Sequence, residues 1–289
     1  MKELHQQLSL KSICSLFGKS RQGWYYLDQH RDDQLMRTAI VLHGVREIRT
    51  HLKRLGGIKI RHKLQELDPP IAIGRDRLYR VLRENDLLIK PRRKYTKTTN
   101  SHHHFRIWPD LVKRARSEAP EQIWVSDITH IQVKSKTAYL SLVTDAYSRK
   151  IVGFYLSRNL KAEGSINALN MALNSRIYPQ QVLIHHSDRG IQYCCADYIS
   201  VLKANNLTVS MTQNGSPYDN AIAERINGIL KIEFQLGENF LSFAAARQQV
   251  ADAIDKYNRL RPHFSCELQT PQYRHAAFHQ VSGKVNTGK

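Results

Sequence analysis

The order of the expected strands and helices after residue 121 constrains the fold of this chain more than any other feature. Three segments rich in β-branched and aromatic residues follow one another at short intervals, and helical segments then alternate with two short apolar ones. The expected strands cover 122–131, 137–145, 150–157, 182–186 and 207–210, and the expected helices cover 162–174, 196–205 and 220–233. Consecutive strands form a meander and later strands join through crossover helices, so this order predicts a mixed five-stranded α/β sheet flanked by helices.

Three acidic residues fall where such a sheet brings them together. Asp127 lies within the first strand, Asp188 lies just past the C-terminal end of the fourth, and Glu224 lies one turn into the last helix. This order of elements is that of the ribonuclease-H-like fold, in which the first and fourth strands are neighbours. We therefore expect the two aspartates to converge at one edge of the sheet, with the helix that carries the glutamate alongside.

Three converging carboxylates suit the chemistry of phosphoryl transfer, which depends on positioning and on neutralisation of charge. They can hold two Mg²⁺ ions about 3.5–4 Å apart, and oxygen ligands favour Mg²⁺ or Mn²⁺ over zinc. We predict that Asp127, Asp188 and Glu224 are both the catalytic and the metal-binding residues, with two ions in each active site. Taken singly, each acid has a structural explanation, as a solvent-facing strand residue, a turn former and a helix N-terminal residue respectively.

The residues around these acids carry further expectations. Lys231 lies seven residues after Glu224, on the same helix face, where it would meet a substrate phosphate. Asp219 and Asn220 are expected to cap the last helix rather than to bind metal. His186 points to the same side of its strand as Asp188, and packing is its expected role.

The charge of the chain indicates a polyanionic partner, most often nucleic acid. Its 44 Lys and Arg against 25 Asp and Glu give a net charge of +19 and a pI of about 9.9. Most of this excess lies in residues 1–120, which carry a net charge of +14. The four cysteines form no C-x-x-C pair, which argues against a structural zinc site, and no uninterrupted apolar stretch approaches the length of a membrane span.

The basic N-terminal part has a helical pattern. A helix over 10–17 followed by Gly18 and Ser20 fits a helix-turn-helix or, equally, a plain helical hairpin. A second such unit is expected from helices over 35–52 and around 60–67. The next helix, residues 75–83, has an apolar stripe and an arginine stripe on different faces, which suits a DNA groove or backbone, although a solvated charged face is the alternative. Residues 90–109 contain six Lys and Arg and no acid, as in a linker that follows a phosphate backbone. The predicted DNA-binding residues are Arg75, Arg77, Arg80, Arg83, Arg92, Arg93, Lys94 and Lys231.

Several motifs in the second part resemble those of one family, the DDE transposases of two-frame bacterial insertion sequences. The resemblance is to the product of the second reading frame, OrfB, whose core is similar to retroviral integrase. Thirty-five residues separate Asp188 from Glu224, which is the spacing in that family. The matching segments are Trp124–Thr129, Asp145–Gly153, His186–Tyr193, Gly215–Glu224, Tyr257–His263 and Thr270-Pro271. His130 and the segment Leu55–Ile60 depart from the family pattern.

The resemblance implies a DNA transposase. Water would cleave the phosphodiester at the end of the element, and the freed 3′-OH would attack a second phosphodiester. The implied partners are double-stranded DNA, as terminal inverted repeats and target, further copies of the chain on paired ends, and the upstream-frame product OrfA. The implied location is the bacterial cytoplasm, at the nucleoid. Two alternatives remain, a non-catalytic DNA-binding regulator and a ribonuclease-H-type nuclease that only hydrolyses.

These expectations divide the chain into four parts. Residues 1–89 are expected to form a helical DNA-binding region of helix-turn-helix type, and residues 90–118 a basic linker. Residues 119–275 are expected to form a ribonuclease-H-like integrase catalytic core with a C-terminal helical extension, and residues 276–289 a tail.

Overall fold

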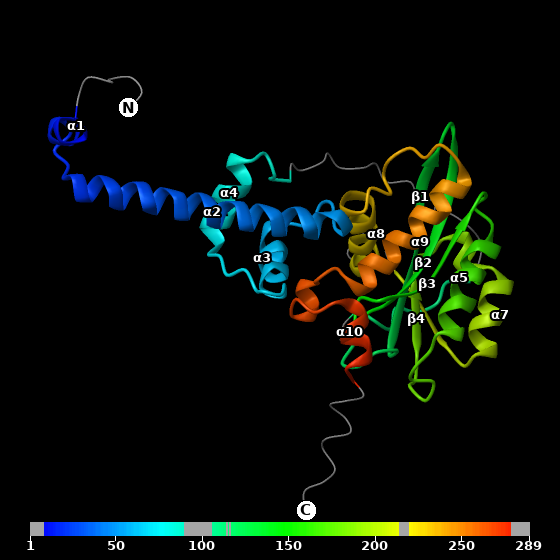
Figure 1. Cartoon of the computed structure of the whole chain (residues 1–289). Coiled ribbons are helices and arrows are strands. Elements are labelled where there is room, and N and C mark those ends of the chain that lie inside the picture. The colour runs from blue at the N-terminus through cyan, green and yellow to red at the C-terminus, as the bar shows by residue number, and fades with distance from the viewer. Residues whose placement is uncertain (1–8, 90–105, 114, 116, 214–219, 279–289) are drawn as a thin grey trace, which may run out of the picture. The chain divides into compact units, whose positions relative to one another are not determined.

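The computed structural model describes residues 9–89, 106–113, 115, 117–213 and 220–278. The chain divides into two compact units (Figure 1). The first comprises residues up to 50 together with 56–88, and the second comprises 51–55 and the residues from 89 onward.

In the described part of the first unit, all regular structure is helical. Its helices are α1 (Leu10–Leu16), α2 (Arg21–His51), α3 (Gly57–Gln65) and α4 (Arg75–Glu84). Gly18 ends α1 with a φ of +62°, and the Ser20 hydroxyl accepts a hydrogen bond from the Gly23 N–H at 2.9 Å, so the turn expected at these residues is confirmed.

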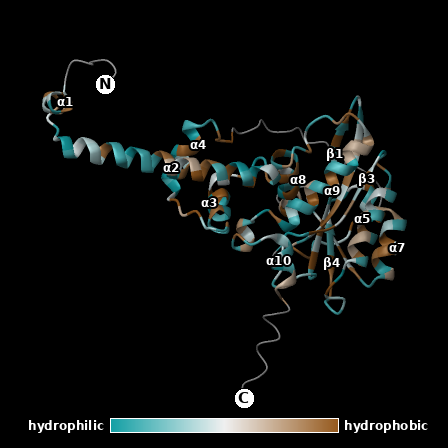
Figure 2. Cartoon of the chain, in the orientation of Figure 1, coloured by the Kyte–Doolittle hydropathy of each residue, from teal (hydrophilic) through white to brown (hydrophobic). Residues whose placement is uncertain are grey.

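The expectation of two separate helices between Ser20 and residue 52 is wrong. α2 runs without interruption from Arg21 to His51, because residues 28–34 contain neither the glycine nor the proline that would break a helix. Figure 2 shows the N-terminal half of α2 in teal and white, while its buried residues begin at Val41. Only the C-terminal half of α2 therefore contributes to the core of the unit.

The core of the first unit lies between α2, α3 and α4. Gly44 allows α2 to approach α3 closely, because a Cβ at this position would lie 2.8 Å from Leu64 Cδ2. A glycine inside a helix destabilises it by roughly 0.5–1 kcal/mol relative to alanine. The close packing of α2 against α3 at Gly44 offsets this loss of helix stability. The buried apolar side chains of the three helices include Val45, Ile48, Ile60, Leu64, Leu78 and Leu82.

The second unit contains the mixed five-stranded sheet that the sequence predicts. Its strands are β1 (Ile123–Val133), β2 (Lys136–Asp145), β3 (Ile151–Ser157), β4 (Ile184–Ser187) and β5 (Thr208–Met211). The order across the sheet is β3-β2-β1-β4-β5. The first three strands pair antiparallel as a meander, and β4 and β5 continue the sheet in parallel with β1. β1 and β4 are thus neighbours, as expected, although β4 begins two residues later than the apolar pattern suggests.

Helices cover both faces of this sheet. They are α5 (Ala162–Asn174), α6 (Ile191–Cys194), α7 (Ala196–Ala204), α8 (Ala221–Glu233), α9 (Phe243–Arg259) and α10 (Pro271–Ala276). α5 and α7 pack on one face around Trp124, Leu169 and Leu202, and Ala223 of α8 packs against Ile123 and Val125 from the other. Gly153 is required under α5, because a Cβ there would lie 2.1 Å from the Ala168 carbonyl oxygen. The ribonuclease-H-like arrangement of sheet and helices is therefore present.

A buried ionic cluster joins α10 to the start of β1 and the end of β2. His275 lies between Glu121, at 3.6 Å, and Asp145, at 3.7 Å. The Ser148 hydroxyl lies 3.0 Å from His275 Nδ1 and donates to Asp145 at 2.6 Å. Arg176 pairs with Glu121 at 2.9 Å, so the cluster is extended to the residues after α5. No described helix is long and apolar enough to cross a membrane.

Candidate active site

The register of the sheet determines where the two aspartates lie. Asp127 stands in the middle of β1, opposite Leu142 of β2. On the other side of β1, Ser126 is paired with Ser187, the last residue of β4. Asp188 follows directly, so the two aspartates come from adjacent parallel strands at the same level of the sheet.

Helix α8 brings Glu224 to this place. Asn220, at the start of the helix, donates its side-chain N–H to the Ser126 carbonyl oxygen at 3.0 Å, which fixes the helix beside β1. Ala223 and Ile226 are buried, whereas Glu224 lies in the first turn and is exposed. Asn220 occupies the N-cap position of α8, as expected, but its side chain makes no capping hydrogen bond, and its Oδ1 has no hydrogen-bond partner among the described residues; Asp219 lies outside the described residues.

The three acids act on one another electrostatically. Burial and the negative charge of Asp188 raise the pKa of Asp127 to about 7, and Glu224 adds to the same effect. The backbone N–H of Ile128 and the side chain of Asn227 oppose this rise in the pKa. Burial and the two acidic neighbours thus hold the Asp127 carboxyl group close to half-ionisation at neutral pH.

Asn227 is a residue of the site that the sequence analysis does not identify. Its side-chain N–H donates to Asp127 Oδ2 at 2.5 Å, and its own Oδ1 is buried without a hydrogen-bond partner among the described residues. It lies three residues after Glu224, so the two side chains lie on neighbouring positions of one helix face. That spacing alone does not mark it as a site residue, because its role depends on the bond to Asp127 across the fold.

The turn after β4 holds Asp188 through its own backbone. Asp188 Oδ1 accepts a hydrogen bond from the Gly190 N–H at 2.9 Å, and Arg189 donates to the Thr212 carbonyl oxygen at 2.7 Å. Asp188 therefore does form the turn, as its structural explanation states, and the same side chain also lies close enough to Asp127 to affect its pKa. The second of these bonds ties the end of β4 to the residue after β5.

Lys231, seven residues after Glu224 on α8, lies within electrostatic reach of Asp127. Burial lowers the pKa of its ammonium group, and the charge of Asp127 acts in the opposite direction. His186, by contrast, is buried and its Nδ1 lies 2.9 Å from the Ser210 hydroxyl, so it packs against β5.

The donor set fits divalent cations. Three carboxylates and the unpartnered Asn227 Oδ1 are hard oxygen donors, and a cation bound among them would remove the repulsion that raises the pKa of Asp127. Within the described residues, no group of three His, Cys, Asp or Glu side chains is drawn together tightly enough to hold a metal ion. The three carboxylates thus lie close enough to interact electrostatically but are not arranged as a complete set of metal ligands.

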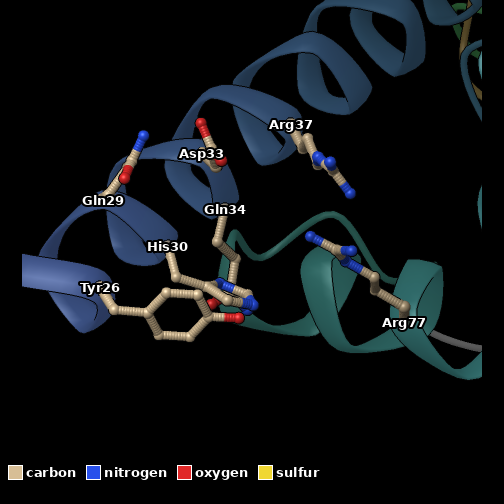
Figure 3. A pocket seen from close by; sticks show the side chains of 7 residues that line it. All are labelled: Tyr26, Gln29, His30, Asp33, Gln34, Arg37 and Arg77. Carbon is tan, nitrogen blue, oxygen red and sulfur yellow. The ribbon is translucent and has the colours of Figure 1, made fainter. Parts of the chain in front are cut away.

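The predicted DNA-binding residues outside this site belong to the first unit or to the linker. Arg77 is half-buried and lines a groove between α2 and α4 (Figure 3), and Arg80 and Arg83 are exposed. Arg75 is exposed and pairs with Asp76 at 2.9 Å. Arg92, Arg93 and Lys94 lie outside the described residues.

Comparisons with known proteins all match integrase core domains or proteins of bacterial insertion elements. Two family models, each described as an integrase core domain, match residues 117–217 and 205–271. A 31 kDa protein of insertion element IS600 from Shigella sonnei is 34% identical over 278 residues, which cover 93% of this chain and all of that protein. The transposase InsF for insertion sequence IS3A from Escherichia coli K12 is 32% identical over 277 residues, which cover 93% of this chain and 95% of the relative.

Among solved structures, the HTLV-2 integrase catalytic core domain in complex with magnesium aligns with a TM-score of 0.45 and 18% identity. The alignment covers 55% of this chain and 99% of that domain.

Proposed function

The chain belongs to the insertion-sequence transposases with an integrase core domain and is a DNA transposase, and we propose that Asp127, Asp188 and Glu224 are its catalytic residues. The observation that carries this proposal is the register of the sheet, which pairs Ser126 with Ser187 and so sets Asp127 and Asp188 side by side, while the Asn227 bond joins the helix of Glu224 to Asp127. Perturbed carboxyl groups that face one another are typical of sites that handle charge during a reaction.

We propose that the same three carboxylates hold two divalent cations, Mg²⁺ or in its place Mn²⁺. Such ions neutralise the charge that develops on the phosphate and make the attacking oxygen a better nucleophile. Asp127 and Asp188 are held from the rigid sheet, and Glu224 approaches from α8.

The remaining residues of the site orient these groups. Asn227 holds one oxygen of Asp127 by its hydrogen bond and so orients the carboxylate. The Gly190 N–H holds Asp188 Oδ1 in the same manner. Lys231 supplies a positive charge on the α8 side, where it would bind a phosphate of the DNA strand.

The reaction that this arrangement supports has two steps. Water attacks the phosphodiester at the end of the insertion sequence, and the leaving oxygen becomes a 3′-OH. That 3′-OH then attacks a second phosphodiester and joins the strands, with displacement of another 3′ oxygen. Both steps are in-line phosphoryl transfers, so one set of carboxylates serves both.

The first unit and the basic linker are proposed to bind the DNA. The helical region 1–89, the linker 90–118, the catalytic core 119–275 and the tail 276–289 are the proposed parts, and residues 1–120 carry most of the positive charge. The proposed partners are terminal inverted repeats, target DNA, further copies of the chain on paired ends, and the OrfA product. The bacterial cytoplasm, at the nucleoid, is the proposed location.

A joining assay tests the function. The full chain is incubated with Mg²⁺ and a labelled duplex that carries the terminal repeat from beside its gene. Cleaved and joined products are expected together.

Asp127→Asn, Asp188→Asn and Glu224→Gln should each abolish both products while the duplex is still bound, because each change removes a charge and keeps the size of the side chain. Cleavage near the wild-type rate in any one variant would remove that residue from the site. Cleavage without joining would indicate a nuclease, and binding alone a regulator.

A further inference from the structure

A groove in the first unit lies between the N-terminal half of α2 and the start of α4. It has a volume of about 360 Å³ and is lined by Tyr26, Gln29, His30, Asp33, Gln34, Arg37 and Arg77. Six of these residues come from α2, and Arg77 alone comes from α4. The groove lies on the same face of α2 that, one to two turns further along, packs into the core through Val41 and Val45. The groove is therefore the polar continuation of a packed helix face.

Two guanidinium groups converge across this groove. Figure 3 shows Arg37 of α2 and Arg77 of α4 with their side chains directed toward one another. Among the described residues, neither guanidinium has an ion pair or a hydrogen bond, whereas neighbouring Arg75 pairs with Asp76 and Arg49 bonds the Leu87 carbonyl oxygen. Two like charges that face one another repel, and an anion between them would convert this repulsion into attraction.

The one acidic residue of the groove does not serve as that anion. Asp33 lies one helical turn before Arg37, at the spacing of an ion pair, yet the two side chains do not pair, and Figure 3 shows Asp33 pointing away from Arg77. The remaining lining groups are amides, a phenol and an imidazole. Tyr26 and His30 contact each other edge to face, with ring centroids 6.0 Å apart. These groups suit a ligand with a charged phosphate and neutral polar neighbours.

We propose that Arg37 and Arg77 together hold a single phosphate group of a DNA strand, which thereby bridges α2 and α4. A guanidinium binds phosphate oxygens through two parallel N–H donors, so one phosphate can be held from both sides. The proposal rests on the proposed role of the first unit in DNA binding and adds Arg37, which no sequence pattern identified. It also assigns to Arg77 a positioning contact, distinct from the exposed Arg80 and Arg83.

The salt dependence of DNA affinity distinguishes one shared phosphate from two separate contacts. Binding of the full chain to a labelled terminal-repeat duplex is measured by fluorescence anisotropy over a range of salt concentrations, for Arg37→Ala, Arg77→Ala and the double variant. Each phosphate neutralised on duplex DNA contributes about 0.9 to the log–log slope. The double variant should lose about 0.9 relative to the wild type if the phosphate is shared. A loss of about 1.8, or no loss, would overturn the proposal.

Matched variants control for folding and for unspecific loss of charge. Arg31→Ala removes an exposed arginine from the same helix, about 120° around its axis from Arg37, and should leave the slope at the wild-type value. The Arg37→Lys and Arg77→Lys double variant keeps both charges and should keep the slope. If Arg31→Ala lowers the slope as much as the double alanine variant does, the groove is not a specific contact and the proposal fails.

Inorganic phosphate separates a DNA phosphodiester from a free phosphate ligand. If phosphate titration detects a site that depends on Arg37 and Arg77 while the DNA slope is unchanged in their absence, the groove binds a small anion and not DNA. The anisotropy measurement is repeated in the Asp188→Asn background, where the same difference in slope is expected. The outcome for the groove is thereby independent of whether the three carboxylates are catalytic.

Discussion

Asn227 of α8 donates a hydrogen bond to Asp127 of β1, so the helix that carries Glu224 is joined directly to the strand that carries the first aspartate. The contact spans one hundred residues of sequence and ends on a carboxyl group whose pKa is raised to about 7. A second bond, from Asn220 to the Ser126 carbonyl oxygen, lies beside it. Together they determine how far α8 stands from the sheet, and hence how far Glu224 stands from Asp127 and Asp188.

Replacement of Asn227 should therefore impair cleavage without abolishing it. Asn227→Ala leaves Asp127 free to rotate, and the loss of a partner that orients a metal ligand typically costs about 10–100-fold in metal affinity or activity. Cleavage rates measured against Mg²⁺ concentration should show a higher half-saturating concentration in the variant. A variant with a wild-type rate and an unchanged Mg²⁺ dependence would show that the bond has no positioning role.

Divalent cations should stabilise the folded chain through the carboxylates. Mg²⁺ or Mn²⁺ added to metal-free protein should raise its melting temperature, because an ion that binds only the folded state shifts the unfolding equilibrium. Ca²⁺ should stabilise the protein and yet fail to support cleavage, since its longer and looser coordination places the attacking oxygen poorly. Asp188→Asn should lose most of the stabilisation. Full cleavage in EDTA, or cleavage restored by zinc alone, would contradict the proposed two-metal site.

The cluster around His275 should make stability depend on pH in two directions. Burial lowers the pKa of His275, but the carboxylates of Asp145 and Glu121 raise it by more, so the net pKa is above 6.5. Its contribution to stability is full below pH 6.5 and is lost as the pH rises through the raised value. Burial raises the pKa of Glu121, yet the His275 side chain 3.6 Å away and the hydrogen bonds from Ile177 and Arg176 bring it down to about 2, so its contribution is present above pH 4.5 and is lost as the pH falls toward 2.

Melting curves of His275→Gln between pH 6 and 9 check the basic side of this dependence. The difference in melting temperature between wild type and variant should be largest, at several degrees, near pH 6 and should shrink as the pH rises. A difference that stays constant across this range would mean that the imidazolium charge does not contribute. This measurement follows unfolding alone and needs no activity.

Two glycines of the second unit should respond to alanine in opposite ways. Gly153→Ala places a methyl group 2.1 Å from the Ala168 carbonyl oxygen, a backbone atom that cannot move aside, and overpacking of this kind costs about 1–3 kcal/mol. Gly228 lies within α8 and a Cβ there would meet nothing within 4 Å, so Gly228→Ala should stabilise the helix by roughly 0.5–1 kcal/mol. Denaturant unfolding of both variants measures the two changes. Equal effects of the same sign would mean that the close approach of β3 to α5 is not maintained in solution.

The strands and the acids could be predicted because their signals are local. Runs of β-branched and aromatic residues mark β1 to β3, and Asp127 and Asp188 stand at positions that the order of strands alone brings together. Asn227 could not be identified in this way, because an asparagine inside a helix has no pattern of its own until the strand opposite it is known. The prediction for Asn220 holds for its N-cap position but not for a capping side chain, for a related reason. Its side chain is oriented by the bond to the Ser126 carbonyl oxygen, a contact that the local sequence does not show.

The uninterrupted length of α2 sets a distance scale for the first unit. Thirty-one residues at 1.5 Å each make a rod of about 46 Å, with α1 attached to one end and the packed pair α3 and α4 on the other half. One turn of a DNA duplex measures about 34–36 Å. If both ends of this helix contact one duplex, the two contacts lie more than a full turn of DNA apart, and the length of α2 fixes that separation. A single glycine or proline inserted near the middle of α2 would change which turns of the duplex the two ends can contact at the same time.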